Sequence, residues 1–129
     1  MTGSPQVAQT TLPPNPVSVG QARAFVARTL VGRGLGDTGL AELLVSELVT
    51  NVVLHAGTDV ELRVAASGDQ VRVEVSDTSP AMPAIRHFGV EAGTGRGMML
   101  VEALASDWGA DPRPGGKTVW FTLTDLVAV

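Results

Sequence analysis

The chain contains no cysteine and only two histidines among its 129 residues. Without thiols it has neither disulfide bonds nor cysteine-ligated metal sites. Two imidazoles alone do not complete the tetrahedral shell that a zinc ion requires. These absences exclude a disulfide-stapled protein and a zinc site built from these side chains alone, and they fit a cytoplasmic chain.

Basic and aromatic residues are also scarce. The chain has nine Lys plus Arg against thirteen Asp plus Glu, a net charge of −4, and only two Trp, three Phe and no Tyr. A broad contact with nucleic-acid phosphates needs many cations, and a base-stacking platform needs aromatic rings. Nucleic acid is therefore not expected as a direct partner.

Long apolar runs are missing as well. No stretch approaches the ~18 consecutive apolar residues of a membrane span, and the first residues lack the positive and apolar regions of a signal peptide. The length and the 44% apolar content are those of one folded domain. We therefore expect a single domain in the cytoplasm with no membrane contact.

Residues 1–16 are expected to form an N-terminal arm. An edge strand fits over residues 7–12, because three prolines within 13–16 prevent regular pairing immediately afterwards. The remaining residues, 17–129, are expected to form one domain.

Two helices are expected next. Ser18 with Gln21 forms the pattern of a capping box, and apolar residues then recur at helical spacing, which predicts a helix over 18–31. Thr38 is suited to begin a second helix over 38–55. The expected buried face of this helix consists of apolar residues at helical spacing: Leu40, Leu43, Leu44, Leu48 and Val52.

The pattern then changes to the period of two that is typical of strands. Apolar residues alternate over 58–64 and again over 71–75, and the Ser-Gly-Asp between them predicts a β-hairpin. Residues 78–94 show little periodicity, and a loop of that length suggests a lid over a ligand.

The last segment predicts a third helix from about residue 95 and two strands, over 108–110 and 117–124. Adjacent strands joined by short turns favour an antiparallel or mixed sheet with helices layered on one face. The expected fold class is therefore α+β: a two-layer α/β sandwich, with a mixed, mostly antiparallel sheet covered on one face by about three helices.

Glu47 and Asn51 are the first candidate site residues. They lie four residues apart in the second predicted helix, so both side chains share one face of it. An amide oxygen beside carboxylate and phosphate oxygens makes the all-oxygen shell in which Mg²⁺ binds while keeping several waters. The pair indicates a magnesium–nucleotide site, although polar residues on an ordinary helix surface give the same spacing.

A glycine-rich run, Gly-Thr-Gly-Arg-Gly at 93–97, leads into the third predicted helix. Its backbone N–H groups and the helix dipole suit an anion, because glycines leave no side chain in the way. A dinucleotide-binding fingerprint is excluded, since Met98 or Leu100 stands where its third glycine is required. An ordinary flexible loop end is the alternative.

Gly116-Lys117-Thr118 imitates the end of a Walker A loop. The first glycine of that motif would fall on Asp111, and the residues that follow are typical of a strand and not of a helix. A P-loop is therefore excluded.

Four blocks of sequence carry a joint resemblance to a known family. They are Glu-Leu-Val-Thr-Asn at 47–51, Asp-Thr-Ser-Pro at 77–80, Gly-Thr-Gly-Arg-Gly-Met-Met-Leu-Val at 93–101 and Gly-Lys-Thr-Val-Trp-Phe at 116–121. Together they resemble the GHKL, or Bergerat-fold, family of histidine-kinase-like ATPases. The short chain and the Asp-x-Ser-Pro block are similar to the anti-sigma-factor serine/threonine kinases within it.

The resemblance implies a role for each matching residue. Asn51 would bind the Mg²⁺ that bridges the phosphates of ATP, and Glu47 would be the catalytic residue that orients or deprotonates the attacking group. Asp77 would accept a hydrogen bond from the adenine amino group, because a carboxylate disfavours the carbonyl that guanine has there. His55, at the end of the second helix, is expected to be solvent-exposed. The nucleotide site would be completed by Gly93, Gly95, Arg96 and Gly97 around the phosphates and by Thr118 near the adenine.

The resemblance also implies a function. The chain would be a Mg-ATP-dependent protein serine/threonine kinase that phosphorylates an anti-sigma antagonist, sequesters a sigma factor and so regulates transcription. Prolines in the predicted lid favour one alternative, a non-catalytic nucleotide-sensing protein-interaction module. A small α+β domain that binds no nucleotide is a further alternative. The sequence leaves homodimer formation open.

Overall fold

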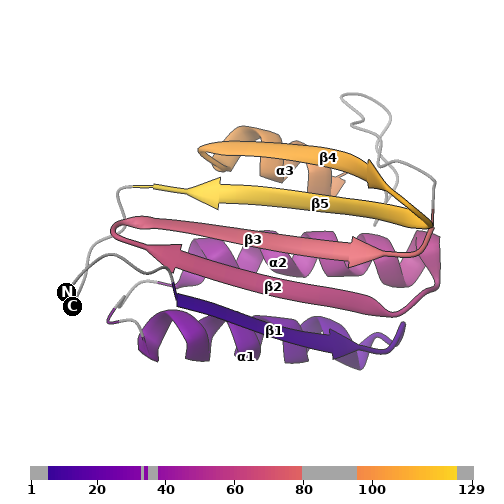
Figure 1. Ribbon diagram of the computed structural model, residues 1–129, viewed down its shortest axis with the longest axis horizontal. Helices are drawn as coiled ribbons and strands as arrows, with labels where there is room; N and C mark the ends of the chain where they lie inside the picture. Colours follow the sequence, from indigo (N-terminus) through magenta and orange to yellow (C-terminus); the bar gives the residue numbers. More distant parts are fainter. Residues whose placement is uncertain (1–5, 33, 35–37, 80–95, 125–129) are drawn as a thin grey trace.

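A sheet of five strands packs against a layer of helices in the computed structural model, which describes residues 6–32, 34, 38–79 and 96–124. The elements in chain order are β1 (Gln6–Leu12), α1 (Val17–Gly32), α2 (Gly39–Asn51), the π-helix η1 (Val52–Ala56), β2 (Val60–Ser67), β3 (Gln70–Asp77), α3 (Arg96–Leu104), β4 (Asp107–Arg113) and β5 (Gly116–Leu123). The three α-helices lie on the same face of the sheet (Figure 1).

The strand order is β1-β2-β3-β5-β4, and each neighbouring pair is antiparallel. The predicted two-layer α+β fold is confirmed, although no strand pair in the described part of the chain is parallel, where a mixed sheet was expected. Short hairpin turns join β2 to β3 and β4 to β5 directly, which accounts for the antiparallel direction of these two pairs. Gly68 and Gly115 occupy these turns with φ angles of 61° and 76°, a conformation that favours glycine.

Alternation along β3 and β5 decides which side chains face the helices. Val73 of β3 pairs with Phe121 of β5, and both side chains are fully buried. Successive side chains of a strand point to opposite faces of the sheet. The same phase therefore brings Asp77, the last residue of β3, and Lys117, near the start of β5, onto this inner face.

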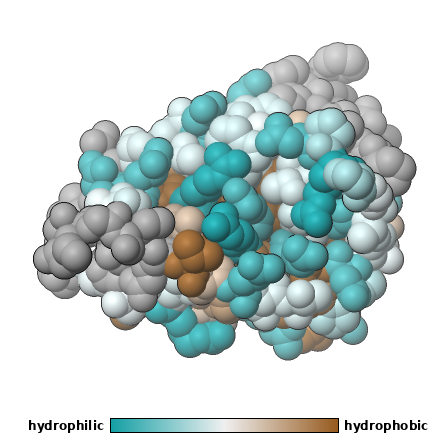
Figure 2. Space-filling model, viewed as in Figure 1, coloured by the Kyte–Doolittle hydropathy of each residue, from teal (hydrophilic) through white to brown (hydrophobic). Residues whose placement is uncertain are grey.

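No helix of the described part of the chain covers the outer face of the sheet, which is largely hydrophilic (Figure 2). Glu74 lies 2.7 Å from the Arg72 guanidinium and 3.6 Å from that of Arg63. Arg72 also stacks over the Trp120 ring, 4.1 Å from its centroid. A polar network of this kind is suited to a sheet face in contact with water.

The helices bury a continuous apolar face against the sheet. The prediction for the second helix is correct for Leu44, Leu48 and Val52, but it is wrong for Leu43, which is 40% exposed. The side chain of Leu43 points away from the core, because the buried face of α2 contains the neighbouring Leu44 instead. The buried residues of α1 and α2 are Ser18, Ala22, Val26, Leu30, Ala41, Leu44, Val45, Ser46, Leu48 and Val49.

The second helix changes its winding at its end. It runs into the π-helix η1 directly after Asn51, and Gly57 closes η1 with an N–H bond of 2.8 Å to the carbonyl of Val52. His55 in η1 is exposed, as expected. Single π-helical turns inside helices are frequent at functional sites, and this one follows the predicted magnesium ligand.

The combined helix Gly39–Ala56 is long and apolar enough to cross a membrane by length and composition alone, with a mean hydropathy of 1.3. It nevertheless carries Glu42 and Glu47, and it contacts α1, α3 and β3 through its buried side. The core helix of a folded domain meets the same criteria, so this helix is no strong indication of a membrane protein.

Gly116, the first residue of β5, lies directly against the end of β3. A Cβ atom at this position would lie 2.0 Å from the carbonyl oxygen of Asp77 and 2.8 Å from the Cα of Thr78. We expect Gly116→Ala to lower the free energy of unfolding by about 1–3 kcal/mol, because backbone atoms must shift to admit the methyl group. Urea denaturation measures this change.

Gly20→Ala in α1 is the matched control. A Cβ atom there would make an ordinary contact, 3.5 Å from a guanidinium nitrogen of Arg23. Alanine inside a helix should be neutral or stabilising by up to ~1 kcal/mol. Equal stability of Gly116→Ala and the wild type would contradict the close contact between β3 and β5.

Candidate functional site

Glu47 and Asn51 lie one turn apart on α2, as predicted, and both are half-buried. Within the described part of the chain, neither side chain makes a hydrogen bond or an ion pair. The buried neighbours Ser46 and Leu48 hold this part of the helix in the core. The helix therefore presents an amide and a carboxylate that are not engaged by the rest of the described structure.

Asp77 ends β3 and is only 5% exposed. Its Oδ1 accepts hydrogen bonds from the backbone N–H of Ser79, at 2.8 Å, and from the Lys117 ammonium, at 3.0 Å. Its Oδ2 is buried and forms an ion pair with the same ammonium at 3.0 Å, but beyond that pair it accepts no hydrogen bond from the described residues. Because buried polar atoms are nearly always hydrogen-bonded, Oδ2 is where the donor of a ligand would be expected.

Lys117 is the residue that faces Asp77, and the sequence interpretation missed it. It is 7% exposed, and it donates to Asp77 and to the carbonyl of Ser79, 3.3 Å away. One signal for it was present in the sequence. Lys117 is in phase with Val119 and Phe121, so strand alternation places it on the buried face.

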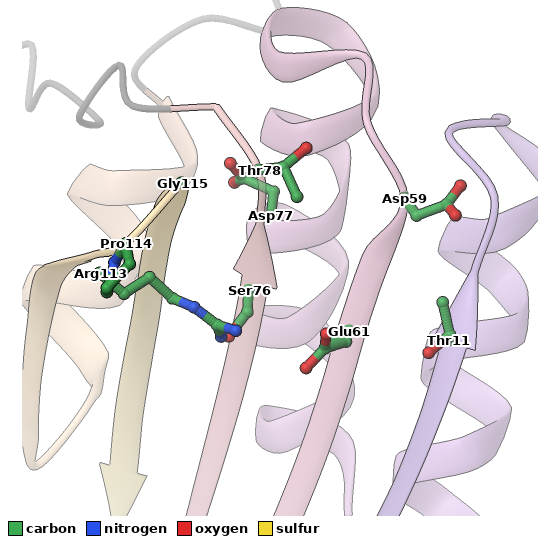
Figure 3. Close-up of a pocket in the computed structure, with 9 residues that line it drawn as sticks. All are labelled: Thr11, Asp59, Glu61, Ser76, Asp77, Thr78, Arg113, Pro114 and Gly115. Atoms are coloured by element: carbon green, nitrogen blue, oxygen red, sulfur yellow. The ribbon is translucent and has the colours of Figure 1, made fainter.

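A cavity of about 230 Å³ opens at the same end of the sheet, where β3 ends and β4 turns into β5 (Figure 3). Glu47 and Asn51 do not line it. The carboxylates of Asp59 and Glu61 do, and negative charges there disfavour a polyphosphate. The full lining is Thr11, Asp59, Glu61, Ser76, Asp77, Thr78, Arg113, Pro114 and Gly115.

The sequence profile of the histidine kinase-like ATPase domain matches residues 12–123. The chain belongs to the histidine kinase-like ATPase family. This membership accounts for the arrangement of sheet and helices, and it implies a nucleotide-binding site. No curated protein sequence is significantly similar to the chain.

Solved structures agree with the fold of a histidine kinase-like ATPase domain. One of them holds the RsbU and RsbW domains of Rv1364c from Mycobacterium tuberculosis, with a TM-score of 0.69 and 22% sequence identity. The match covers 92% of this chain and 32% of that chain, so this chain spans about a third of the solved one. At this identity the likeness shows the fold alone.

Thr118 lies on the opposite face of the sheet from Asp77, because it pairs with Ser76. Its hydroxyl is 2.7 Å from that of Ser76 and accepts a hydrogen bond of 3.5 Å from Arg113. That Thr118 lies near an adenine stays a prediction. The residue of β5 that lies opposite Asp77 is Lys117, whereas Thr118 lies opposite Ser76.

The predicted phosphate loop lies mostly outside the described residues. This is the case for Gly93 and Gly95 and for nearly all of the predicted lid, 78–94. Arg96 and Gly97 form the first turn of α3, so a helix does begin where the glycine run predicts one. Phosphate binding by these residues stays a prediction.

A magnesium site in this domain would have to rely on few protein ligands. Among the described residues, no group of three or more His, Asp or Glu side chains is suited to hold a metal ion. Mg²⁺ bound with a nucleotide needs only one or two protein oxygens, because phosphates and waters complete its shell. Asn51, with the unengaged Glu47 one turn away, fits that mode of binding.

The ion pair between Asp77 and Lys117 yields a stability prediction. Lys117→Met leaves a buried carboxylate without its cation, so we expect the free energy of unfolding to fall by about 3–5 kcal/mol. Adding Asp77→Asn removes the uncompensated charge and should restore part of the loss. Urea denaturation of the two single variants and the double variant measures the coupling.

Arg63→Met is the matched control, because it removes a cation from an exposed ion pair. The Arg63 side chain is 43% exposed and lies 3.6 Å from Glu74. Its loss should change the free energy of unfolding by less than about 1 kcal/mol. Strictly additive effects of Lys117→Met and Asp77→Asn would contradict a direct interaction between the two groups.

Proposed function

We propose that this domain binds Mg-ATP and acts as a protein serine/threonine kinase of the anti-sigma type. It would phosphorylate an anti-sigma antagonist and sequester a sigma factor. The observation that carries the nucleotide part is the buried Asp77 Oδ2, in a chain of the histidine kinase-like ATPase family. Beyond its ion pair with Lys117, this oxygen accepts no hydrogen bond from the described residues.

Adenine is the base that this acceptor suits. Its exocyclic amino group donates a hydrogen bond, whereas guanine presents a carbonyl oxygen at the same position. A carbonyl would bring two acceptors together in a buried place, which costs more than a merely absent bond. Asp77 therefore favours ATP over GTP.

Asn51 and Glu47 supply the remaining chemistry from α2. Asn51 would hold the magnesium ion through its amide oxygen, and the ion when bound neutralises phosphate charge. Glu47 would accept the proton of the serine or threonine hydroxyl that attacks the γ-phosphate. Both side chains lack other partners among the described residues, which leaves them available for these roles.

Two observations support the regulatory partners. The Asp-x-Ser-Pro block resembles anti-sigma-factor kinases, and the fold matches a chain that contains an RsbW domain. Phosphate transfer to an antagonist would distinguish this function from that of a nucleotide-sensing module, which would bind ATP at the same site without transferring phosphate.

Calorimetric titration tests the nucleotide site. We expect ATP to bind only with Mg²⁺ and at least about tenfold more tightly than GTP, a difference of ~1.4 kcal/mol or more. Asn51→Ala should weaken Mg-ATP binding by about tenfold or more, because an oxygen ligand of the ion is lost. Gln9→Ala, which removes an exposed amide on β1, should leave binding unchanged. Equal affinity for ATP and GTP would contradict the role of Asp77.

Phosphate transfer from γ-labelled ATP to a purified anti-sigma antagonist tests the kinase activity. Glu47→Gln should keep the ATP affinity within about threefold and slow transfer by about 10²–10⁴-fold, the usual contribution of a general base. Glu42→Gln, on the same helix, should transfer at the wild-type rate. ATP binding by the wild type without any transfer would favour the nucleotide-sensing module.

A further inference from the structure

We propose that Lys117 is the positioning residue of the base-binding acceptor. Its ammonium holds the Asp77 carboxylate in one orientation and so sets the selectivity for adenine. This inference rests on the proposed function, because it concerns the same nucleotide site. In this role Lys117 touches neither the base nor the phosphates, and it acts only through Asp77.

The sheet fixes the place of the Lys117 ammonium. Lys117 pairs in register with Asp77, and only 7% of the residue is exposed. The ammonium lies 3.0 Å from Oδ1 and 3.0 Å from Oδ2 of Asp77. The preceding Gly116 lets the backbone of β5 lie directly against the carbonyl oxygen of Asp77. Two successive residues of β5 therefore hold the end of β3, one through its backbone and the other through its charge.

Hydrogen bonds also join Lys117 to the chain just after β3. The ammonium donates to Oδ1 of Asp77 and, at 3.3 Å, to the carbonyl of Ser79. The backbone N–H of Ser79 donates to the same Oδ1 at 2.8 Å. Lys117, Asp77 and Ser79 thus form a closed ring of contacts in which Oδ1 accepts from two donors.

An aspartate carboxylate needs such contacts to keep one orientation. The torsion that turns it about the Cβ–Cγ bond is broad and does not by itself select an angle. In Asp77 the two bonds to Oδ1 and the ion pair select one, and this determines where Oδ2 meets a ligand. A binding group discriminates well only when neighbouring contacts hold it in place. The ammonium therefore contributes to base selectivity through the carboxylate.

Charge balance alone explains less of this arrangement. A counterion needs only to lie near the carboxylate, so the contact between Lys117 and the carbonyl of Ser79 adds nothing to that role. Buried ion pairs also contribute little net stability compared with apolar residues of similar volume. A residue that orients Asp77 relative to the following backbone accounts for both contacts.

The absence of cysteine allows two matched side chains to be placed at position 117. Lys117→Cys introduces the only thiol of the chain. Alkylation of the unfolded variant with bromoethylamine, followed by refolding, restores an ammonium at nearly the length of lysine. Alkylation with iodoacetamide gives a neutral amide of similar size. Wild-type protein taken through the same steps is the control for refolding.

The quantity to measure is the ratio of the Kd for GTP to the Kd for ATP, by calorimetry with Mg²⁺. The form with the restored ammonium should keep this ratio within about twofold of the wild-type value. The neutral form should show a ratio of about 1–2, because its Asp77 is no longer held. Partial unfolding weakens both affinities by the same factor, so the ratio separates positioning from stability.

A wild-type ratio in the neutral form would overturn the proposal, because Asp77 would then select adenine without Lys117. An equally low ratio in both alkylated forms would also overturn it, because the restored ammonium would have restored nothing. Either result leaves ATP binding by the wild type established. Absence of ATP binding by the wild type would instead reject the proposed function, and the role of Lys117 with it.

A measurement on the wild type decides the question if the alkylated forms do not fold. Lys117 is the only lysine, so isotope labelling of lysine gives a single side-chain ammonium signal in NMR. An ammonium held by buried acceptors exchanges its protons slowly enough to be observed, and its signal should persist when Mg-ATP binds. Loss of the signal on addition of Mg-ATP would overturn the proposal, because the base would then bind without the ammonium on Asp77.

Discussion

β5 begins against the last residues of β3, and Gly116 lets the two backbones meet with no side chain between them. This contact holds the register in which Lys117 faces Asp77 and Thr118 faces Ser76. A slip of one residue would exchange the two faces of β5. It would remove the ammonium from the buried side of the sheet and place a hydroxyl there. The chemistry of the site therefore depends on a backbone contact that involves no functional side chain.

The buried ion pair between Asp77 and Lys117 is not explained by its contribution to stability alone. Removing two charges from water is costly, and an apolar pair of similar volume often stabilises a fold as well or better. The pair lies at the end of the inner rows of β3 and β5, where the next pair is Val75 with Val119 and the one after it is Val73 with Phe121. Beyond the ion pair, Oδ2 of Asp77 accepts no hydrogen bond from the described residues, so it is able to accept one from a ligand, which an apolar pair would not. Its position at the strand ends lets the core stay apolar elsewhere.

The two faces of the sheet carry different kinds of chemistry. The inner face is covered by helices, and α2 presents Glu47 and Asn51 beside residues that it buries in the core. The outer face carries exposed ion pairs and a cavity with the carboxylates of Asp59 and Glu61 (Figures 2 and 3). A nucleotide polyphosphate suits the first environment better than the second. The face of the sheet on which a side chain lies therefore determines whether its surroundings suit a nucleotide.

The sequence by itself determined the features that local periodicity encodes. The helix expected over 18–31 and the hairpin strands are present because apolar spacing and turn residues act within a few positions. Glu47 and Asn51 share a helix face for the same local reason. Which residue would face Asp77 was decided only by the tertiary structure, since Lys117 lies 40 positions away in the chain. Local patterns are silent on strand register, which arises when distant strands pair and bury their apolar faces together.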